Sequence, residues 1–197
     1  MDAVEQAIAA RAASLERHFR ALEPWIALPE PAWSTRPAPD SWSPAEIVEH
    51  LERMQHFILL LAEKIAARGV KRSASGAALP TEPSDVSKLQ ELAQHRFRWN
   101  HPEHMTPRGG RARAELRREL DAQRTRFLDL LRRTPRGEGA LHTVRMSVVG
   151  ERLDLYQFLA LVDLHLERHL AQLERAAAVL KARSGSPRSR PGDAAGT

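Results

Sequence analysis

Residues 43–68 read SPAEIVEHLERMQHFILLLAEKIAAR, and this stretch decides the fold. Ser43, Pro44 and Glu46 are typical of a helix start, in which a hydroxyl caps the first turn, proline takes its first position and a glutamate closes a capping box. Apolar residues then recur at the helical period, which predicts one buried face that ends before Gly69. The predicted inward residues are Ile47, His50, Leu51, Met54, Phe57, Ile58, Leu61 and Ile65.

Three further stretches carry the same helical period, at residues 2–22, 112–134 and 151–183, and no stretch has a convincing strand alternation. The count predicts an all-α protein, a four-helix bundle. Residues 69–111 separate the second and third of these helices, which is too long for an ordinary bundle loop, and residues 84–98 within them are expected to form a short helix. A connection of this length allows two consecutive helices to run in the same direction, so we expect a long crossover.

The composition suits one domain. The chain has 197 residues, of which 42% are hydrophobic and 28% are charged. We expect the bundle to occupy residues 1–183 and to be followed by a disordered basic tail over residues 184–197, where there is little apolar surface to bury. Residues 181–197 carry +3 of the net charge of +5, and 26 of the 30 basic residues are arginine in an alanine-rich chain, which is typical of GC-rich coding. The net charge is therefore a weak indication of nucleic-acid binding.

Several classes of protein are excluded by what the sequence lacks. It contains no cysteine, which excludes disulfides, a cysteine nucleophile and thiolate metal ligands from this chain. There is no phosphate-binding glycine loop and no nucleophile elbow. No apolar run approaches the roughly 20 residues that span a bilayer, and the N-terminus does not read as a signal peptide. We therefore expect a cytoplasmic protein.

Three of the nine histidines stand out by position. His165 and His169 are four residues apart on the last helix, so both rings lie on one face at the spacing of a metal chelate. His50 occupies an inward position on the second helix. Three neutral imidazoles suit zinc or nickel and leave coordination positions open. The alternative is that they are core histidines bonded to carbonyls or to each other, but clustered imidazoles share few partners in a dry interior.

Two segments of the sequence that contain these three histidines resemble a known family. The segment from Trp42 to Leu51, WSPAEIVEHL, followed by residues 165–172, HLERHLAQ, is similar to the DinB-like superfamily of damage-inducible bacterial four-helix proteins. Residues 96–98, 102–103 and 107–109 resemble the crossover of one branch of it, so the likeness covers about residues 10–180. The resemblance implies a four-helix bundle and a divalent metal, nickel or zinc. Its ligands would be His50, His165 and His169.

The best-understood relatives implied by this resemblance are bacillithiol or mycothiol S-transferases and a mycothiol-dependent isomerase. They imply a low-molecular-weight thiol as cosubstrate. A metal with open positions can hold such a thiol as its thiolate, a nucleophile that a chain without cysteine does not provide. The predicted function is thus metal-dependent transfer of a thiol to an electrophilic small molecule.

Two other functions remain open. The histidines would hold a metal without turnover in a stress-response protein, or the arginines of residues 108–133 would bind nucleic acid. Those arginines alternate with acidic residues and have no aromatic platform, which favours a solvated helix face. A homodimer through a helix face is common for bundles of this size.

Several polar residues have less certain roles. Gln172 and Arg168 flank the histidine pair and are candidates to orient ligands, and Glu46 is a candidate acceptor for the His50 ring. His101 and His104, in a proline-flanked segment, are candidates to cap the pocket or to form a second weak metal site, although solvated loop residues are the commoner case.

Overall fold

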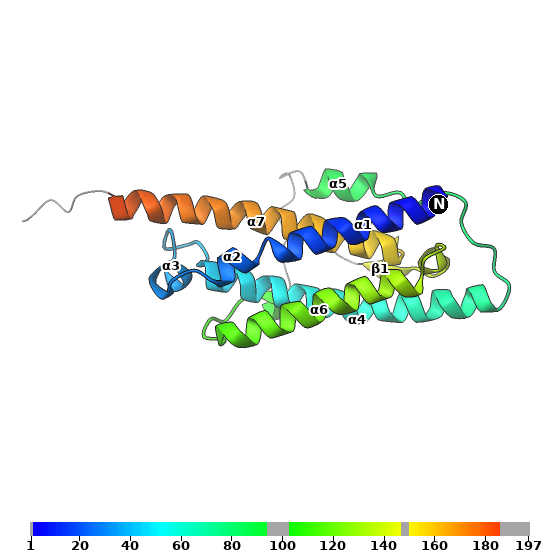
Figure 1. Cartoon of the computed structure of the whole chain (residues 1–197), viewed down its shortest axis with the longest axis horizontal. Helices are drawn as coiled ribbons and strands as arrows, with labels where there is room; N and C mark the ends of the chain where they lie inside the picture. The colour runs from blue at the N-terminus through cyan, green and yellow to red at the C-terminus, as the bar shows by residue number, and fades with distance from the viewer. Residues whose placement is uncertain (1, 94–102, 147–149, 186–197) are drawn as a thin grey trace, which may run out of the picture.

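Four long helices form the body of the molecule, and the computed structural model describes residues 2–93, 103–146 and 150–185 (Figure 1). The long helices are α1 (Ala3–Arg20), α4 (Pro44–Ala74), α6 (Arg113–Arg133) and α7 (Leu155–Gly185). The shorter elements are α2 (Glu23–Ile26), α3 (Glu30–Ser34), α5 (Ser87–Ala93), the 3-10 helices η1 (Glu103–Met105) and η2 (Glu138–Leu141), and the strands β1 (Val144–Met146) and β2 (Glu151–Leu153). The predicted all-α class is confirmed, with one short hairpin added.

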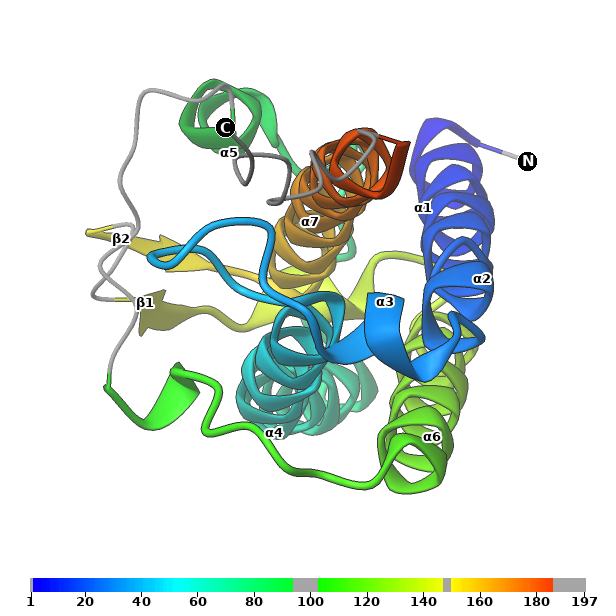
Figure 2. The ribbon, with the colours of Figure 1, turned by 90° about the vertical axis from the view of Figure 1, so that its left-hand side faces the viewer.

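The long helices form a bundle in which α1 lies diagonally opposite α4, and α6 lies diagonally opposite α7 (Figure 2). α4 packs against α6 and α7, and α1 packs against the same two helices. Figure 1 shows that α4 and α6 run in one direction and α1 and α7 in the other. The connection between α4 and α6 therefore returns along the length of the bundle, as predicted. Its helix α5 packs on α7, while residues 94–98 of the helix expected there lie outside the described residues.

The core forms from the helical stripes, with one shift on α4. Ile47, Leu51 and Ile58 are fully buried, as their spacing predicts. Phe57, predicted to point inward, is 38% exposed, whereas Leu59 and Ala62 are fully buried. The stripe is displaced because α4 is covered by two helices and η2, so its buried face is wider than a single stripe.

The helix α4 does not end at Gly69, as the sequence suggested, but continues to Ala74. A Cβ atom at Gly69 would lie 2.1 Å from the carbonyl oxygen of Glu138. The glycine thus allows η2 to approach the helix closely, and it is a packing residue rather than a helix terminator.

The helix α7 begins at Leu155, four residues later than predicted. Asp154 caps it, because its Oδ1 accepts a hydrogen bond of 2.9 Å from the Gln157 backbone and Gln157 Oε1 accepts one of 3.0 Å from the Asp154 backbone. Residues 151–153 instead pair as β2 with β1, beside Gly150 at a φ of 76°. The capping signal Asp-x-x-Gln is readable in the sequence, but three-residue strands are too short for an alternating pattern to show.

No helix among the described residues has an apolar stretch that is long enough to cross a membrane.

Candidate metal centre

His50 owes its place to the start of α4. Ser43 Oγ accepts a hydrogen bond from the Glu46 backbone, and Glu46 Oε2 accepts one of 2.8 Å from the Ser43 backbone, so the predicted capping box is present. Burial raises the pKa of Glu46, but the Arg36 guanidinium and the Ser43 hydrogen bonds lower it by more. The pKa of Glu46 therefore lies below its usual value. Glu46 is occupied by these contacts and does not orient His50, which was its other candidate role.

The three histidines converge inside the bundle. His50 and His169 are 4% and 6% exposed, and the Nε2 atoms of His50 and His165 are 3.3 Å apart. The Nε2 atoms of His169 and His165 are 3.1 Å apart. One ligand nitrogen from each ring lies within 4.8 Å of the other two. The fold thus brings together two helices whose histidines are 115 residues apart along the chain.

The outer nitrogens of two rings are tied to oxygen atoms. His50 Nδ1 donates to the backbone carbonyl of Met105 at 2.9 Å, and His169 Nδ1 donates to Gln172 Oε1 at 2.8 Å. Both oxygens only accept hydrogen bonds, so each Nδ1 carries a proton and each Nε2 presents a lone pair toward the centre. This is the usual arrangement of histidine ligands, in which an outer acceptor fixes the ring and its tautomer.

The donor set fits a divalent cation. Zinc bonds imidazole nitrogen at about 2.0–2.1 Å, which in a tetrahedral site separates two nitrogens by about 3.3 Å. The Nε2 separations of 3.1 and 3.3 Å are close to this value. A proton on His165 Nε2 can point at only one of the other two rings, whereas a cation contacts all three at once. Three nearby histidines could therefore bind a metal ion, and their assignment as its ligands remains a prediction.

The segment that carries Met105 is held against α4 by Glu49, the residue before His50. Its buried carboxylate accepts hydrogen bonds from the backbone N–H groups of Arg108 and Gly109, at 3.1 and 2.9 Å, and pairs with Arg53. The Trp42 ring also packs near His50, with the two ring centroids 4.9 Å apart. Loop and tryptophan together fix the His50 ring from outside.

The rotation of α7 is set by a buried ion pair on its other face. Asp163 accepts hydrogen bonds from Arg11 Nη1 at 2.5 Å and from His18 Nδ1 at 2.6 Å, both on α1. Burial raises the pKa of Asp163. The hydrogen bonds from His18 and Ser14 and the charge of Arg11 lower this pKa by more, so it lies below its usual value. Two residues correspond to about 200° around a helix, so anchoring Asp163 to α1 turns His165 toward α4.

Sequence reasoning identified Gln172 as a candidate to orient a ligand, and the structure shows its bond to His169. Arg168 makes no hydrogen bond to the three rings among the described residues. Met105 was missed because its contribution is a backbone carbonyl, which no side-chain pattern reveals. His101 lies outside the described residues, as does the side chain of His104 on η1.

Of the comparisons with known proteins, one finds a match. Searches of curated proteins and of solved structures find no match. The family model described as the DinB superfamily matches residues 9–173, a segment that contains the four long helices in large part and all three converging histidines. The chain belongs to the DinB superfamily.

Proposed function

We propose that His50, His165 and His169 hold a divalent metal, zinc or nickel, and that the protein transfers a low-molecular-weight thiol to an electrophilic small molecule. The observation that carries the metal half is the convergence of three Nε2 atoms, 3.1 and 3.3 Å apart, from two helices. Support for the thiol half comes from the resemblance to bacillithiol and mycothiol S-transferases. It also comes from the composition, because a chain without cysteine relies on a cosubstrate for a sulfur nucleophile.

The metal, when bound, supplies a Lewis acid with open coordination positions that favours the thiolate form of a thiol. The protein's own residues hold and orient the imidazoles: Met105 and Gln172 keep the outer N–H groups engaged. In the overall reaction a carbon–sulfur bond forms, the leaving group departs with its bonding pair, and the thiol proton is released to solvent.

The metal half is tested by elemental analysis of protein purified without a His-tag or chelator. We expect about one divalent ion per chain in the native protein and a loss of at least about tenfold in occupancy for His50→Ala. His56→Ala is the matched control, because His56 lies on the same helix but is exposed. Full occupancy in the His50→Ala protein, or none in native protein offered zinc and nickel, would contradict the assignment.

The thiol half is tested with the metal-loaded protein, bacillithiol or mycothiol, and a chromogenic aryl chloride. We expect product formation that requires both thiol and metal and that is lost in His50→Ala. Stoichiometric metal without transfer for a range of thiols and electrophiles would instead support the non-catalytic metal-binding protein.

Nucleic-acid binding by the arginines of α6 and the preceding loop is the less supported function. Arg111 pairs with Glu52 and Glu115, Arg124 with Glu16, and Arg126 with Glu63. These guanidinium groups are engaged within the bundle, which supports the expectation of a solvated, ion-paired helix face.

A further inference from the structure

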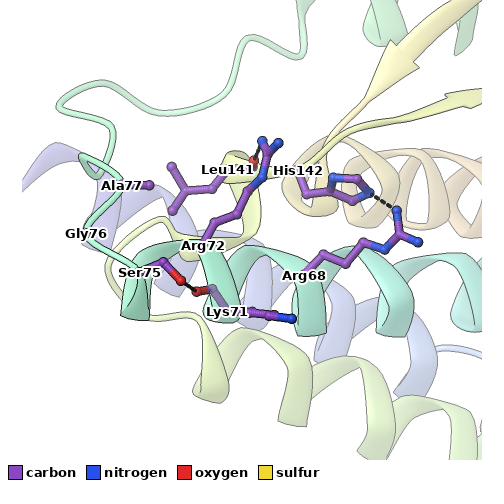
Figure 3. A pocket seen from close by; sticks show the side chains of 8 residues that line it. All are labelled: Arg68, Lys71, Arg72, Ser75, Gly76, Ala77, Leu141 and His142. Atoms are coloured by element: carbon purple, nitrogen blue, oxygen red, sulfur yellow. Dashed lines mark hydrogen bonds between the residues drawn. The ribbon is translucent and has the colours of Figure 1, made fainter.

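A basic cleft lies at the far end of α4 from the histidines. It has a volume of about 630 Å³ and is lined by Arg68, Lys71 and Arg72 of α4, by Leu141 at the end of η2 and by His142 after it. Figure 3 shows the Arg68 guanidinium facing the His142 ring, with Nη1 and Nε2 3.4 Å apart. Arg72 Nη1 donates to the Leu141 carbonyl at 2.7 Å, which fixes this second guanidinium at the cleft.

The cations of the cleft differ from many other basic residues in the described part of the chain. Within the described part of the chain, no carboxylate forms an ion pair with Arg68, Lys71 or Arg72. On the same helix Arg53 pairs with Glu49, and Arg124 and Arg126 of α6 pair with Glu16 of α1 and Glu63 of α4. The lining residues include no acidic side chain. Positive charge is thus concentrated in a concave site without internal compensation.

The hairpin beside the cleft adds to this charge. Arg145 on β1 lies directly opposite Arg152 on β2 in the antiparallel register. Like charges at such positions repel and destabilise the pair, so their presence is unexpected for a purely structural hairpin. Arg152 is held by hydrogen bonds to Thr143, of 2.9 Å to its hydroxyl and 2.6 Å to its carbonyl.

The positive charges near the cleft affect the pKa of His142. Burial and the charges of Arg68, Arg72, Arg152 and Lys64 lower its pKa below the ordinary value. These groups come from both elements that face the ring, α4 and the hairpin. The ring is therefore neutral near pH 7, and an anion in the cleft would oppose the same charges and raise its pKa.

A helix dipole explains only part of the cluster. Lys71 and Arg72 lie in the last turn of α4, where cations interact favourably with the carbonyl end of the helix. His142 lines the cleft, and Arg152 on β2 lies near enough to lower the pKa of His142, but neither residue gains anything from that dipole. Their position beside the cations of α4 needs a separate cause.

We propose that this cleft binds a small phosphate-bearing anion, such as a phosphate ester or a diphosphate. Guanidinium groups form paired, charge-assisted hydrogen bonds with phosphate oxygens, and several uncompensated charges favour a dianion over a monoanion. The volume lies in the range of small-molecule sites. Among the described residues, no phenylalanine, tyrosine or tryptophan lines the cleft as a stacking platform for bases, which favours a small anion over a nucleic-acid strand.

The site is separate from the metal centre. His50 and Arg68 are 18 residues apart on one continuous helix, or about 27 Å at 1.5 Å per residue. A ligand in the cleft therefore does not contact the three histidines, and the proposal does not rest on the function proposed above.

The test is a titration of the full-length protein with inorganic pyrophosphate at low ionic strength, followed by calorimetry and by NMR of the His142 ring. The His142 resonance is identified by its absence from the His142→Gln protein. We expect saturable binding and a rise in the His142 pKa. The double variant R68Q/R72Q should bind at least about tenfold more weakly, because two charge-assisted contacts are lost. The control R117Q/R175Q removes two exposed charges near the opposite end of the bundle and should change affinity by no more than about twofold.

Several outcomes would overturn the proposal. They are the absence of saturable binding at millimolar pyrophosphate, equal weakening in the two double variants, and an unchanged His142 pKa. His50→Ala should bind pyrophosphate with unchanged affinity, and loss of binding there would place the anion at the metal centre instead. Tighter binding of single-stranded DNA or of phosphatidic acid vesicles through Arg68 and Arg72 would assign the surface to those ligands and reject a small soluble anion. Melting temperatures of all variants exclude unfolding as the cause.

Discussion

The outer nitrogens of His50 and His169 are held by acceptors of two kinds. Gln172 lies three residues after His169 on the same helix, so helical spacing alone places it beside the ring. Met105 lies 55 residues from His50, and only the folded path of the crossover brings its carbonyl to the ring. The three converging histidines and the contact from Gln172 were therefore readable from the sequence, and the contact from Met105 was not.

Replacing Gln172 tests the ring-orienting role. In Gln172→Leu the His169 Nδ1–H loses its acceptor, and we expect zinc affinity to fall by about tenfold. Gln172→Glu keeps an acceptor of similar reach and should retain most of the affinity. Competition against a chelator of known affinity measures both variants. Equal affinity of the leucine variant and the native protein would show that helix packing alone fixes the His169 ring.

Asp154 gives a pH dependence with a defined sign. Burial raises the pKa of its carboxyl above 3.8, against the hydrogen bonds from Ser84 and from the Gln157 backbone. The folded state therefore binds this proton more tightly than the unfolded state, so the contribution of Asp154 to the free energy of unfolding is lost as pH rises through the raised pKa.

The variant Asp154→Asn keeps a capping oxygen but does not titrate. Its free energy of unfolding should fall less than that of the native protein as the pH is raised from about 3.8 through the raised pKa. Urea denaturation at a series of pH values provides the comparison. Parallel pH profiles for the two proteins would show that Asp154 has the same affinity for protons in both states.

At the scale of single elements, the start of α4 was easier to predict than its end. The start of α4 at Pro44 is fixed by a local capping box, and the sequence placed it correctly. Its end was misplaced because Gly69, a typical stop signal, is used here to let η2 approach. Local sequence patterns indicate the conformational preference of a short segment. They contain no information about a contact with Glu138, which lies about 70 residues away along the chain.

Gly69→Ala separates helix propensity from packing. Propensity alone predicts stabilisation by about 1 kcal/mol. The new Cβ would lie 2.1 Å from a backbone oxygen of Glu138, so we expect net destabilisation by about 1–3 kcal/mol. Ala67→Gly, at an exposed position on the same helix, measures the propensity effect alone and should cost about 1 kcal/mol. Thermal or urea denaturation of both variants measures the change in the free energy of unfolding. A rise in the stability of Gly69→Ala would reject the packing argument.

For the whole molecule, the all-α class and the crossover follow from the number of periodic stretches and the length of one connection. The sequence did not give the diagonal placement of α1 and α4, because that depends on which apolar faces fit together. The shift of the α4 stripe away from Phe57 has the same origin. Pairing of α1 with α7 through Arg11, His18 and Asp163 likewise joins residues that no local pattern connects.

A metal that bridges α4 and α7 should stabilise the entire bundle. At a free metal concentration 100 times its dissociation constant, mass action contributes about 2.7 kcal/mol, or roughly 5–10 °C in melting temperature for a chain of this size. Differential scanning fluorimetry with zinc or nickel should show this rise in native protein and not in His50→Ala. An equal rise in both proteins would place the stabilising ion elsewhere.

The parallel course of α4 and α6 has a consequence for a chain cut in two. A break in the connection between them leaves α1 and α4 on one fragment and α6 and α7 on the other, and each helix packs mainly against helices of the opposite fragment. His50 would lie on the first fragment, and His165 and His169 on the second. Neither piece alone holds a core or a complete set of imidazoles, so the natural topology already resembles a split reporter whose reassembly a metal ion would promote.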